Sequence, residues 1–330
     1  MSGTGRSLLE IRGLSLSYAQ PSGEPVRALK GVNLQIRPGE VLGILGESGC
    51  GKSTLANAVL GLTHRSARVE AGEILLGDSD LLSLPESKLR PIRGRQISLV
   101  PQEPALALNP VLSVGTQIGE VLRAHMSFSG KVRRERIDEL LVEVGFDRPA
   151  DIRNSYPHQL SGGQRQRIVL AQAIACGPQL LIADEPTSKL DAALRSEIAE
   201  LLQKLHLRHG MAILLISHDV ALIASLSDRI ALMYAGSVIE SGLSADILAR
   251  PLHPYTQALL RLARSSVIAS TTGKTHLPEI EGEHWQETSS DAGCPFEQDC
   301  LDRMAVCTQR APHERTPEPT RVVSCFRYGG

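Results

Sequence analysis

The first feature of the sequence that could do chemistry is a glycine-rich segment, GESGCGKST, at residues 46–54. It fits the pattern G-x-x-x-x-G-K-[ST], in which glycines let the backbone curl so that several N–H groups point at phosphate oxygens. Lys52 is placed to reach the β- and γ-phosphates, and Ser53 to bind Mg²⁺. The pattern predicts a nucleotide-phosphate site made of Gly46, Glu47, Ser48, Gly49, Cys50, Gly51, Lys52, Ser53 and Thr54.

Two carboxylates follow an apolar segment further along the chain. Residues 180–183 are typical of a buried strand and lead into Asp184 and Glu185. A carboxylate at the carboxyl end of a parallel strand lies in the ligand crevice. We expect Asp184 to hold Mg²⁺ through water and Glu185 to act as a general base on an attacking water. Two acids alone are also typical of a solvated turn, but beside a phosphate loop they indicate nucleotide hydrolysis.

A second group of small residues, LSGGQ at 160–164, precedes a helical pattern. Ser161 can cap that helix, and Gly162 and Gly163 leave N–H groups free at its start, as a phosphate-binding helix terminus does. The phosphate loop already encloses its own nucleotide. We therefore expect this segment, which includes Gln164, to meet a nucleotide held by another subunit, with an ordinary capped helix as the alternative.

Strands and helices that could position these groups are visible in the apolar pattern. Residues 8–45 are typical of strands joined by turns, and their last five residues predict a buried strand. A further buried strand is expected at 213–216. A helix directly after the phosphate loop is indicated by one apolar face, formed by Leu55, Ala58, Val59 and Leu62. Strands separated by helices predict an α/β fold with a parallel sheet between helices.

Three segments depart from that alternation. Residues 103–175 are largely helical in pattern, above all 132–144 and 163–175, and predict a helical insertion. A hairpin is expected at 229–241, turning at Ala235-Gly236. Residues 265–293 are polar and predict a linker or irregular segment.

The ordered motifs resemble those of ATP-binding-cassette (ABC) ATPases. LSGGQ, the RQR after it and LLIADEPT at 180–187 are similar to the family's signature and Walker B regions, and the resemblance covers roughly residues 8–264. It implies a P-loop NTPase cassette that binds ATP and Mg²⁺. The implied cassette has a mixed sheet with flanking helices, an antiparallel β subdomain and a helical subdomain at about 103–175.

The same resemblance assigns roles to further residues. Gln102, in LVPQEP, matches the Q-loop glutamine that touches Mg²⁺ and the attacking water and couples to the membrane partner. His218, in ISHD, matches the histidine that contacts the γ-phosphate, and Tyr18 matches the aromatic residue that stacks on adenine. The D-loop, 188–191, has Lys189 where a small residue is usual. In this family two cassettes pair head to tail, so that the signature of one closes on the ATP of the other.

Four cysteines crowd into the last part of the chain: Cys294, Cys300, Cys307 and Cys325. Four thiolates can hold a [4Fe–4S] cluster or a zinc ion, and four unligated thiols are the alternative. The lack of any C-x-x-C pair weakens the case for zinc. Four of the six cysteines lie in this last part of the chain, and such uneven placement suggests that the tail is a separate unit.

The tail resembles the C-terminal extension of oligopeptide, dipeptide and nickel importer ATPases. HPYTQALL at 253–260, LPEIEG at 277–282 and GCPFEQDC at 293–300 carry this resemblance. Some members of that group hold a [4Fe–4S] cluster on these cysteines, so iron–sulfur is expected over zinc, as a staple for a small domain. We expect two domains, a cassette at 1–264 and an extension at 265–330.

Composition and hydropathy argue against a nucleic-acid-binding, a membrane-spanning and a secreted protein. Lysine plus arginine number 35 and aspartate plus glutamate 36, so no basic field favours nucleic acid. No apolar run is long enough to cross a bilayer, and no signal peptide is visible. The resemblance implies an ATPase subunit on the cytoplasmic face of the cell membrane that energises the import of peptides or a related small solute. Its expected partners are a second cassette, two permeases and, indirectly, a solute-binding protein. The alternatives are a soluble non-transport ABC ATPase and a non-hydrolysing regulator.

Overall fold

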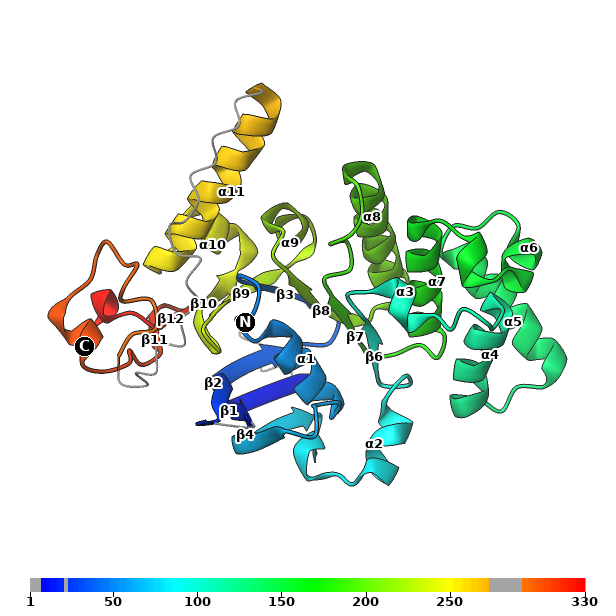
Figure 1. The fold of residues 1–330 in the computed structure, drawn as a ribbon, viewed down its shortest axis with the longest axis horizontal. Helices are drawn as coiled ribbons and strands as arrows, with labels where there is room; N and C mark the ends of the chain where they lie inside the picture. The colour runs from blue at the N-terminus through cyan, green and yellow to red at the C-terminus, as the bar shows by residue number, and fades with distance from the viewer. Residues whose placement is uncertain (1–6, 21–22, 273–292, 330) are drawn as a thin grey trace.

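The computed structural model describes residues 7–20, 23–272 and 293–329, which form two sheets and a group of helices (Figure 1). The helices beyond β6 lie at one end of the larger sheet, and the C-terminal strands lie at the other. Within these ranges no helix is both long enough and apolar enough to cross a membrane.

The larger sheet has the strand order β11-β12-β10-β9-β3-β8-β7-β6. The five strands from β9 to β6 in this order are parallel, whereas β10, β12 and β11 join antiparallel. The predicted mixed sheet is therefore confirmed. Its strands are β3 (Val41–Leu45), β6 (Ile97–Val100), β7 (Leu180–Asp184), β8 (Ala212–Ser217), β9 (Arg229–Tyr234), β10 (Ser237–Leu243), β11 (Arg315–Glu318) and β12 (Arg321–Val323).

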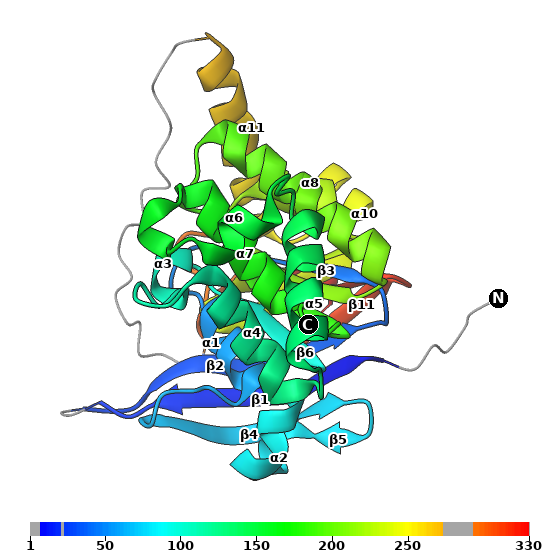
Figure 2. The ribbon, with the colours of Figure 1, turned by 90° about the vertical axis from the view of Figure 1, so that its right-hand side faces the viewer.

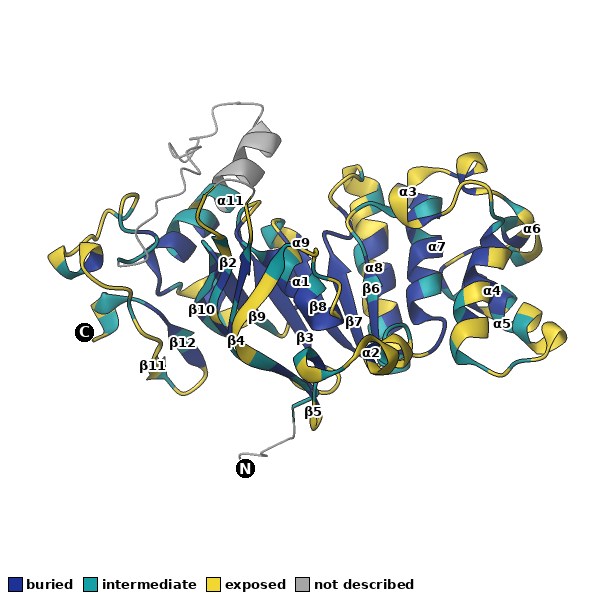
Figure 3. Cartoon of the chain, turned by 60° about the horizontal axis from the view of Figure 1, so that its bottom comes forward, coloured by how far each residue is buried: buried dark blue, intermediate teal, exposed yellow. Residues whose placement is uncertain are grey.

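The strands nearest the site are apolar because both of their faces are covered. β3, β7 and β8 are buried along their whole length, as Figure 3 shows for the centre of the molecule. The predicted hairpin is also present, since β9 and β10 pair across Ala235 and Gly236. Both turn residues have positive φ, 46° and 85°, which fits a tight hairpin turn.

An antiparallel sheet in the order β2-β1-β4-β5 packs against α1 and the larger sheet. Leu14 and Leu16, which alternate with serines in the sequence, are fully buried in the resulting core. This sheet is the predicted antiparallel subdomain. Its strands are β1 (Leu9–Tyr18), β2 (Val26–Ile36), β4 (Ala67–Leu76) and β5 (Ser79–Asp80).

The predicted helical insertion is confirmed and lies beyond the β6 edge of the larger sheet (Figures 1 and 2). Ser113, Ser129 and Ser161 cap three of its helices by accepting hydrogen bonds from backbone N–H groups. The helices are α3 (Pro104–Ala107), α4 (Val114–His125), α5 (Gly130–Glu143), α6 (Pro149–Asn154) and α7 (Gly162–Ile174).

The remaining helices include one that corrects the sequence prediction. They are α1 (Lys52–Leu60), α2 (Glu86–Ile92), α8 (Ala192–His209), α9 (Val220–Leu226), α10 (Ser244–Ala249) and α11 (Pro254–Thr272). Because α11 continues to Thr272, the expected linker at 265–293 was wrong for its first part. No proline or glycine interrupts residues 255–272, so nothing in the sequence ends the helix earlier. The LPEIEG motif lies outside the described residues.

Part of the C-terminal extension continues the larger sheet. β12 pairs with β10 through Glu240 opposite Val323 and Ser241 opposite Val322. Phe296, near the start of the described extension, is buried in the same apolar cluster as the core strands. The division into domains at residue 265 stays a prediction.

Candidate functional site

The phosphate loop runs from the end of β3 to the start of α1, as the sequence predicts. Gly51 begins the helix with φ 107° and no side-chain cap, so the first N–H groups of α1 have no capping partner. A Cβ at Gly51 would lie 2.6 Å from the carbonyl oxygen of Ala28, so only glycine fits there. Ser48, Gly49 and Ser53 are exposed, which leaves the loop open to a ligand.

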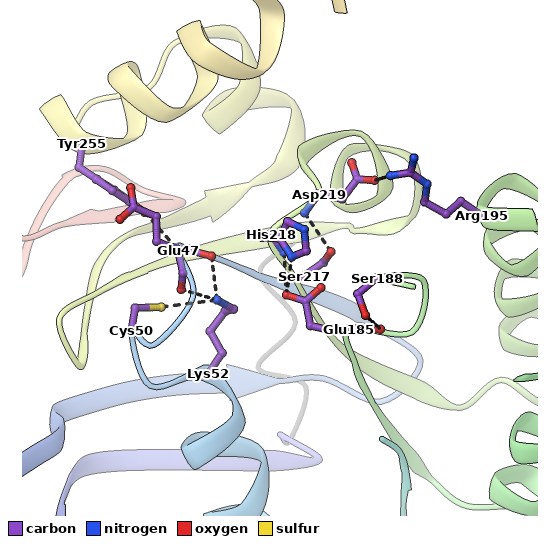
Figure 4. Close-up of polar contacts among 11 residues, drawn as sticks. Glu47, Cys50, Lys52, Glu185, Ser188, Arg195, Ser217, His218, Asp219 and Tyr255 are labelled. Atoms are coloured by element: carbon purple, nitrogen blue, oxygen red, sulfur yellow. Dashed lines mark hydrogen bonds and ion pairs between the residues drawn. The ribbon is translucent and has the colours of Figure 1, made fainter. Parts of the chain in front are cut away.

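Lys52 lies over the loop rather than in solvent (Figure 4). Its Nζ donates to the carbonyl oxygens of Gly46 at 2.7 Å and Glu47 at 2.6 Å. Cys50 is buried beside it, with Sγ 3.7 Å from Nζ, and burial raises the pKa of that thiol. The ammonium group is thus held within reach of any phosphate that enters the loop.

Asp184 ends β7 and lies next to the start of α1. Its carboxyl group is buried, and the Oδ1 atom has no hydrogen-bond partner. Burial raises the pKa of Asp184, which a hydrogen bond from Ser53 partly offsets. A buried acceptor without a partner beside a serine hydroxyl is an arrangement that suits a hard divalent cation.

Glu185 and His218 form a pair across the ends of β7 and β8 (Figure 4). Glu185 Oε1 accepts a hydrogen bond from the His218 backbone N–H at 3.1 Å, and His218 Nδ1 lies 2.8 Å from the same oxygen. This contact raises the pKa of the His218 imidazole, which is otherwise largely exposed. Glu185 has φ 50°, a strained value for a non-glycine residue that is typical of functional sites.

Tyr18 lies beside the phosphate loop, whereas Gln102 lies in the segment after β6. The Tyr18 hydroxyl lies 3.4 Å from Oγ1 of Thr54, the last residue of the phosphate-loop motif. Gln102 is exposed in the segment that follows β6. Its neighbour Glu103 pairs with Lys189, with 2.7 Å between Oε1 and Nζ, so the unusual D-loop lysine contacts the Q-loop segment.

The LSGGQ segment lies apart from the phosphate loop of its own chain. It begins α7 in the helical region, whereas α1 lies beneath the centre of the larger sheet (Figure 1). Ser161 and Gln164 form a capping box, in which each side chain accepts from the other's backbone N–H at 3.2 and 2.9 Å. Gly162 is exposed, and a Cβ added to it would meet no atom within 4 Å, so the helix start is open to a partner.

One residue that contacts the phosphate loop, Tyr255, was not predicted from the sequence. Tyr255, in α11, is buried, and its hydroxyl oxygen accepts a hydrogen bond from the Glu47 backbone N–H at 3.2 Å. The only available signal was its place in HPYTQALL, a motif that indicated family membership but no contact.

The four tail cysteines are neighbours, but they do not form a ligand set. The Cys294 N–H donates to the Cys307 carbonyl oxygen at 2.7 Å. Burial, and to a smaller degree the other thiols, raise the pKa of Cys294 to about 11 and also raise the pKa of Cys300 and Cys325. In the described ranges, no three His, Cys, Asp or Glu side chains are arranged to hold a metal ion. The structure therefore gives no support to the predicted iron–sulfur or zinc site.

Comparisons with known proteins agree with this geometry. The family model for ABC transporters matches residues 29–188, and the model for the oligopeptide/dipeptide transporter C-terminal region matches residues 239–307. The dipeptide transport ATP-binding protein DppD of Bacillus subtilis is 39% identical over 97% of this chain and 94% of its own length. The oligopeptide transport ATP-binding protein OppD of Salmonella typhimurium is 37% identical over 97% and 93%.

A solved structure shares the fold at lower coverage. The dimeric ATP-binding cassette MJ0796, in a post-hydrolysis state bound to ADP and phosphate, is 31% identical and superposes with a TM-score of 0.64. The match covers 72% of this chain and 98% of that one. The chain therefore belongs to the ATP-binding subunits of ABC transporters, in the group that carries the oligopeptide/dipeptide transporter C-terminal region.

Proposed function

We propose that this chain hydrolyses ATP to energise the import of peptides, or of a related small solute, through partner membrane permeases. The observation that supports this most is the order of three adjacent parallel strands, β3, β8 and β7. Their carboxyl ends lead into the phosphate loop, His218 and the Asp184–Glu185 pair respectively. Because these ends meet at one edge of the sheet, the groups needed to bind and cleave a triphosphate face one crevice.

The phosphates of ATP are assigned to the phosphate loop. Lys52 would exchange its contacts with the Gly46 and Glu47 carbonyl oxygens for the β- and γ-phosphates. Asp184 and Ser53 would hold Mg²⁺, since the Asp184 Oδ1 atom is buried without a partner and Ser53 lies beside it. When bound, Mg²⁺ neutralises negative charge on the phosphate oxygens.

Hydrolysis is assigned to Glu185 and His218. Glu185 would accept the proton of the attacking water, a general-base role that contributes about 10²–10⁴-fold to a rate. His218 holds the Glu185 carboxylate through two contacts, and both are to Oε1 rather than to Oε2. Gln102 would orient the water and report to the membrane partner, and Tyr18 would stack on adenine.

A second cassette would complete the site. The open helix start at Ser161 and Gly162 is suited to the γ-phosphate of ATP bound to a partner chain. The dimeric state of the cassette MJ0796 supports this arrangement. The names of the relatives DppD and OppD support peptides as the solute class. We infer a peripheral position on the cytoplasmic face of the membrane, with two permeases as direct partners and a solute-binding protein as an indirect one.

A [4Fe–4S] cluster on Cys294, Cys300, Cys307 and Cys325 stays a prediction from the resemblance, with zinc as the alternative. The described arrangement of these thiols does not fit a ligand set, so no step of the proposed function depends on it. Anaerobic purification followed by iron and sulfide assays tests the prediction. A colourless protein without iron would reject it.

Co-purification from membranes tests the proposed function. The chain is expected to come with two permeases, and ATP hydrolysis by the assembly is expected to rise when a peptide-loaded binding protein is added. A Lys52→Ala assembly, prepared in the same way, is the control for ATPase activity that does not belong to this chain. ATPase activity in a chain that never associates with permeases would instead favour the soluble non-transport ATPase.

A further inference from the structure

The phosphate loop contacts Tyr255, a residue of α11 that packs against the C-terminal extension. This residue is 1% exposed, lies near the start of α11 and accepts a hydrogen bond from the Glu47 N–H (Figure 4). Because that N–H donates to Tyr255, it is turned toward α11. We propose that Tyr255 is a positioning residue for the phosphate loop, held in place by the cysteine-containing extension. This inference rests on the proposed assignment of ATP to that loop.

The peptide unit between Gly46 and Glu47 is a suitable point of control, because both of its polar groups are used. Its N–H, that of Glu47, donates to Tyr255, and its carbonyl oxygen, that of Gly46, accepts from Lys52 Nζ at 2.7 Å. Fixing the N–H therefore also fixes the carbonyl group against which the phosphate-binding lysine rests. The Tyr255 hydroxyl acts on Lys52 through one peptide unit.

The extension holds the Tyr255 ring by direct packing. Phe296 lies edge-on to Tyr255, with ring centroids 5.5 Å apart, and edge-on to Tyr234 at 5.4 Å. Tyr234 and Tyr255 are themselves 4.8 Å apart, so the three rings form one cluster. Glu47, Cys50, Cys294 and Phe296 also line one cavity of about 1130 Å³, so the extension forms a wall of the space beside the loop.

A second connection from the extension reaches the backbone just before Tyr255. Arg321, on β12, pairs with Glu240 on β10, and both side chains are fully buried. Glu240 in turn accepts from the Leu252 and His253 N–H groups, each at 2.9 Å. The His253 ring then accepts from the Tyr255 N–H at 3.1 Å. Docking of the extension thus fixes both the ring and the backbone of Tyr255.

Hydrogen exchange and ADP binding on the full chain test this proposal. Tyr255→Phe keeps the ring but removes the acceptor of the Glu47 N–H. Exchange at residues 46–50 is expected to become faster, and ADP affinity to fall about threefold to tenfold, the effect of one lost neutral hydrogen bond. Phe296→Ala, or Phe296→Leu if the smaller residue prevents folding, is expected to act in the same direction. Because both changes act on the same contact, the double variant is expected to lose less ADP affinity than the product of the two separate fold-losses.

Tyr328→Phe is the matched control. It removes the hydrogen bond from Tyr328, in the extension, to the Leu252 carbonyl oxygen at 3.1 Å. The Leu252 and His253 N–H groups keep their bonds to Glu240, and the loop is not touched. ADP affinity and exchange at 46–50 are expected to stay within twofold of the parent chain. Unchanged exchange and affinity in Tyr255→Phe, or an equal loss in Tyr328→Phe, would overturn the proposal. A parent chain that binds no ADP would instead reject the proposed function, and the exchange comparison would still test the role of Tyr255.

Discussion

Replacing Arg321 by methionine should release the C-terminal extension from the core. Arg321 and Glu240 are both 0% exposed and lie 2.5 Å apart between β12 and β10. Removing one partner of a buried ion pair leaves an uncompensated charge and typically costs 3–5 kcal/mol. Glu240 keeps two backbone N–H donors, from Leu252 and His253, so we expect the lower end, about 3 kcal/mol.

A second substitution separates loss of charge balance from loss of packing. In Arg321→Met combined with Glu240→Gln, neither charge of the buried pair remains, and the amide oxygen still accepts from one of the two N–H groups. We expect the double variant to recover about 1–2 kcal/mol of the stability that the single variant loses. Urea unfolding followed by circular dichroism measures both values, and limited proteolysis reports release of residues 293–329.

Arg327→Met is the matched control for this experiment. Arg327 pairs with Asp302 at 2.5 Å within the same extension, but the two side chains are 40% and 49% exposed. An exposed pair contributes about 0–1 kcal/mol, so the control should change stability little. A loss of stability in Arg321→Met no larger than that in Arg327→Met would contradict this prediction, as would a double variant as unstable as the single one.

Three further predictions concern residues around the loop. Burial lowers the pKa of His253 to about 4, against about 6.5 in the unfolded chain, so the unfolded chain takes up the imidazole proton at a higher pH than the folded one. The free energy of unfolding should therefore fall by about 3 kcal/mol as pH drops from 6.5 to 4, and urea unfolding should show this fall as the difference between the parent chain and His253→Asn. Gly51→Ala places a Cβ 2.6 Å from the Ala28 carbonyl oxygen at φ 107°, so stability should fall by about 1–3 kcal/mol and calorimetry should detect no ADP binding; near-parental binding would contradict this. Lys189→Ala removes an exposed ion pair to Glu103, so any loss in thermal unfolding should stay under about 1 kcal/mol and disappear near 1 M salt; a loss that persists in salt would argue against a screened pair.

The parts of the site that depend on local pattern could be predicted from the sequence. The phosphate loop, the Asp184–Glu185 pair and the cap at Ser161 each combine a fixed residue order with a strand or helix of clear periodicity. The structure has the strand ends and helix starts that these patterns predict, whereas the assigned chemical roles stay predictions. Glycine at position 51 is a good example, because its φ and its close contact with Ala28 require that residue type.

The contacts that link distant segments could not be predicted. Glu240 and Arg321 lie 81 residues apart, and a glutamate on a strand is usually a solvated residue. Nothing in the pattern around Tyr255 indicates that its hydroxyl meets Glu47, 208 residues earlier. The linker prediction failed at 265–272 for a different reason: serine and threonine lower helix propensity only slightly, and α11 continues through them.

In the proposed function, the Ser161–Gln164 segment of a neighbouring cassette completes the ATP site on this chain's phosphate loop. A cryo-EM map of the membrane assembly carrying Glu185→Gln, trapped with Mg²⁺ and ATP, tests it most directly. We expect a closed pair of cassettes, with this segment of each chain against the γ-phosphate of the other's ATP. A map in which ATP is bound but residues 161–164 lie far from any nucleotide would contradict it.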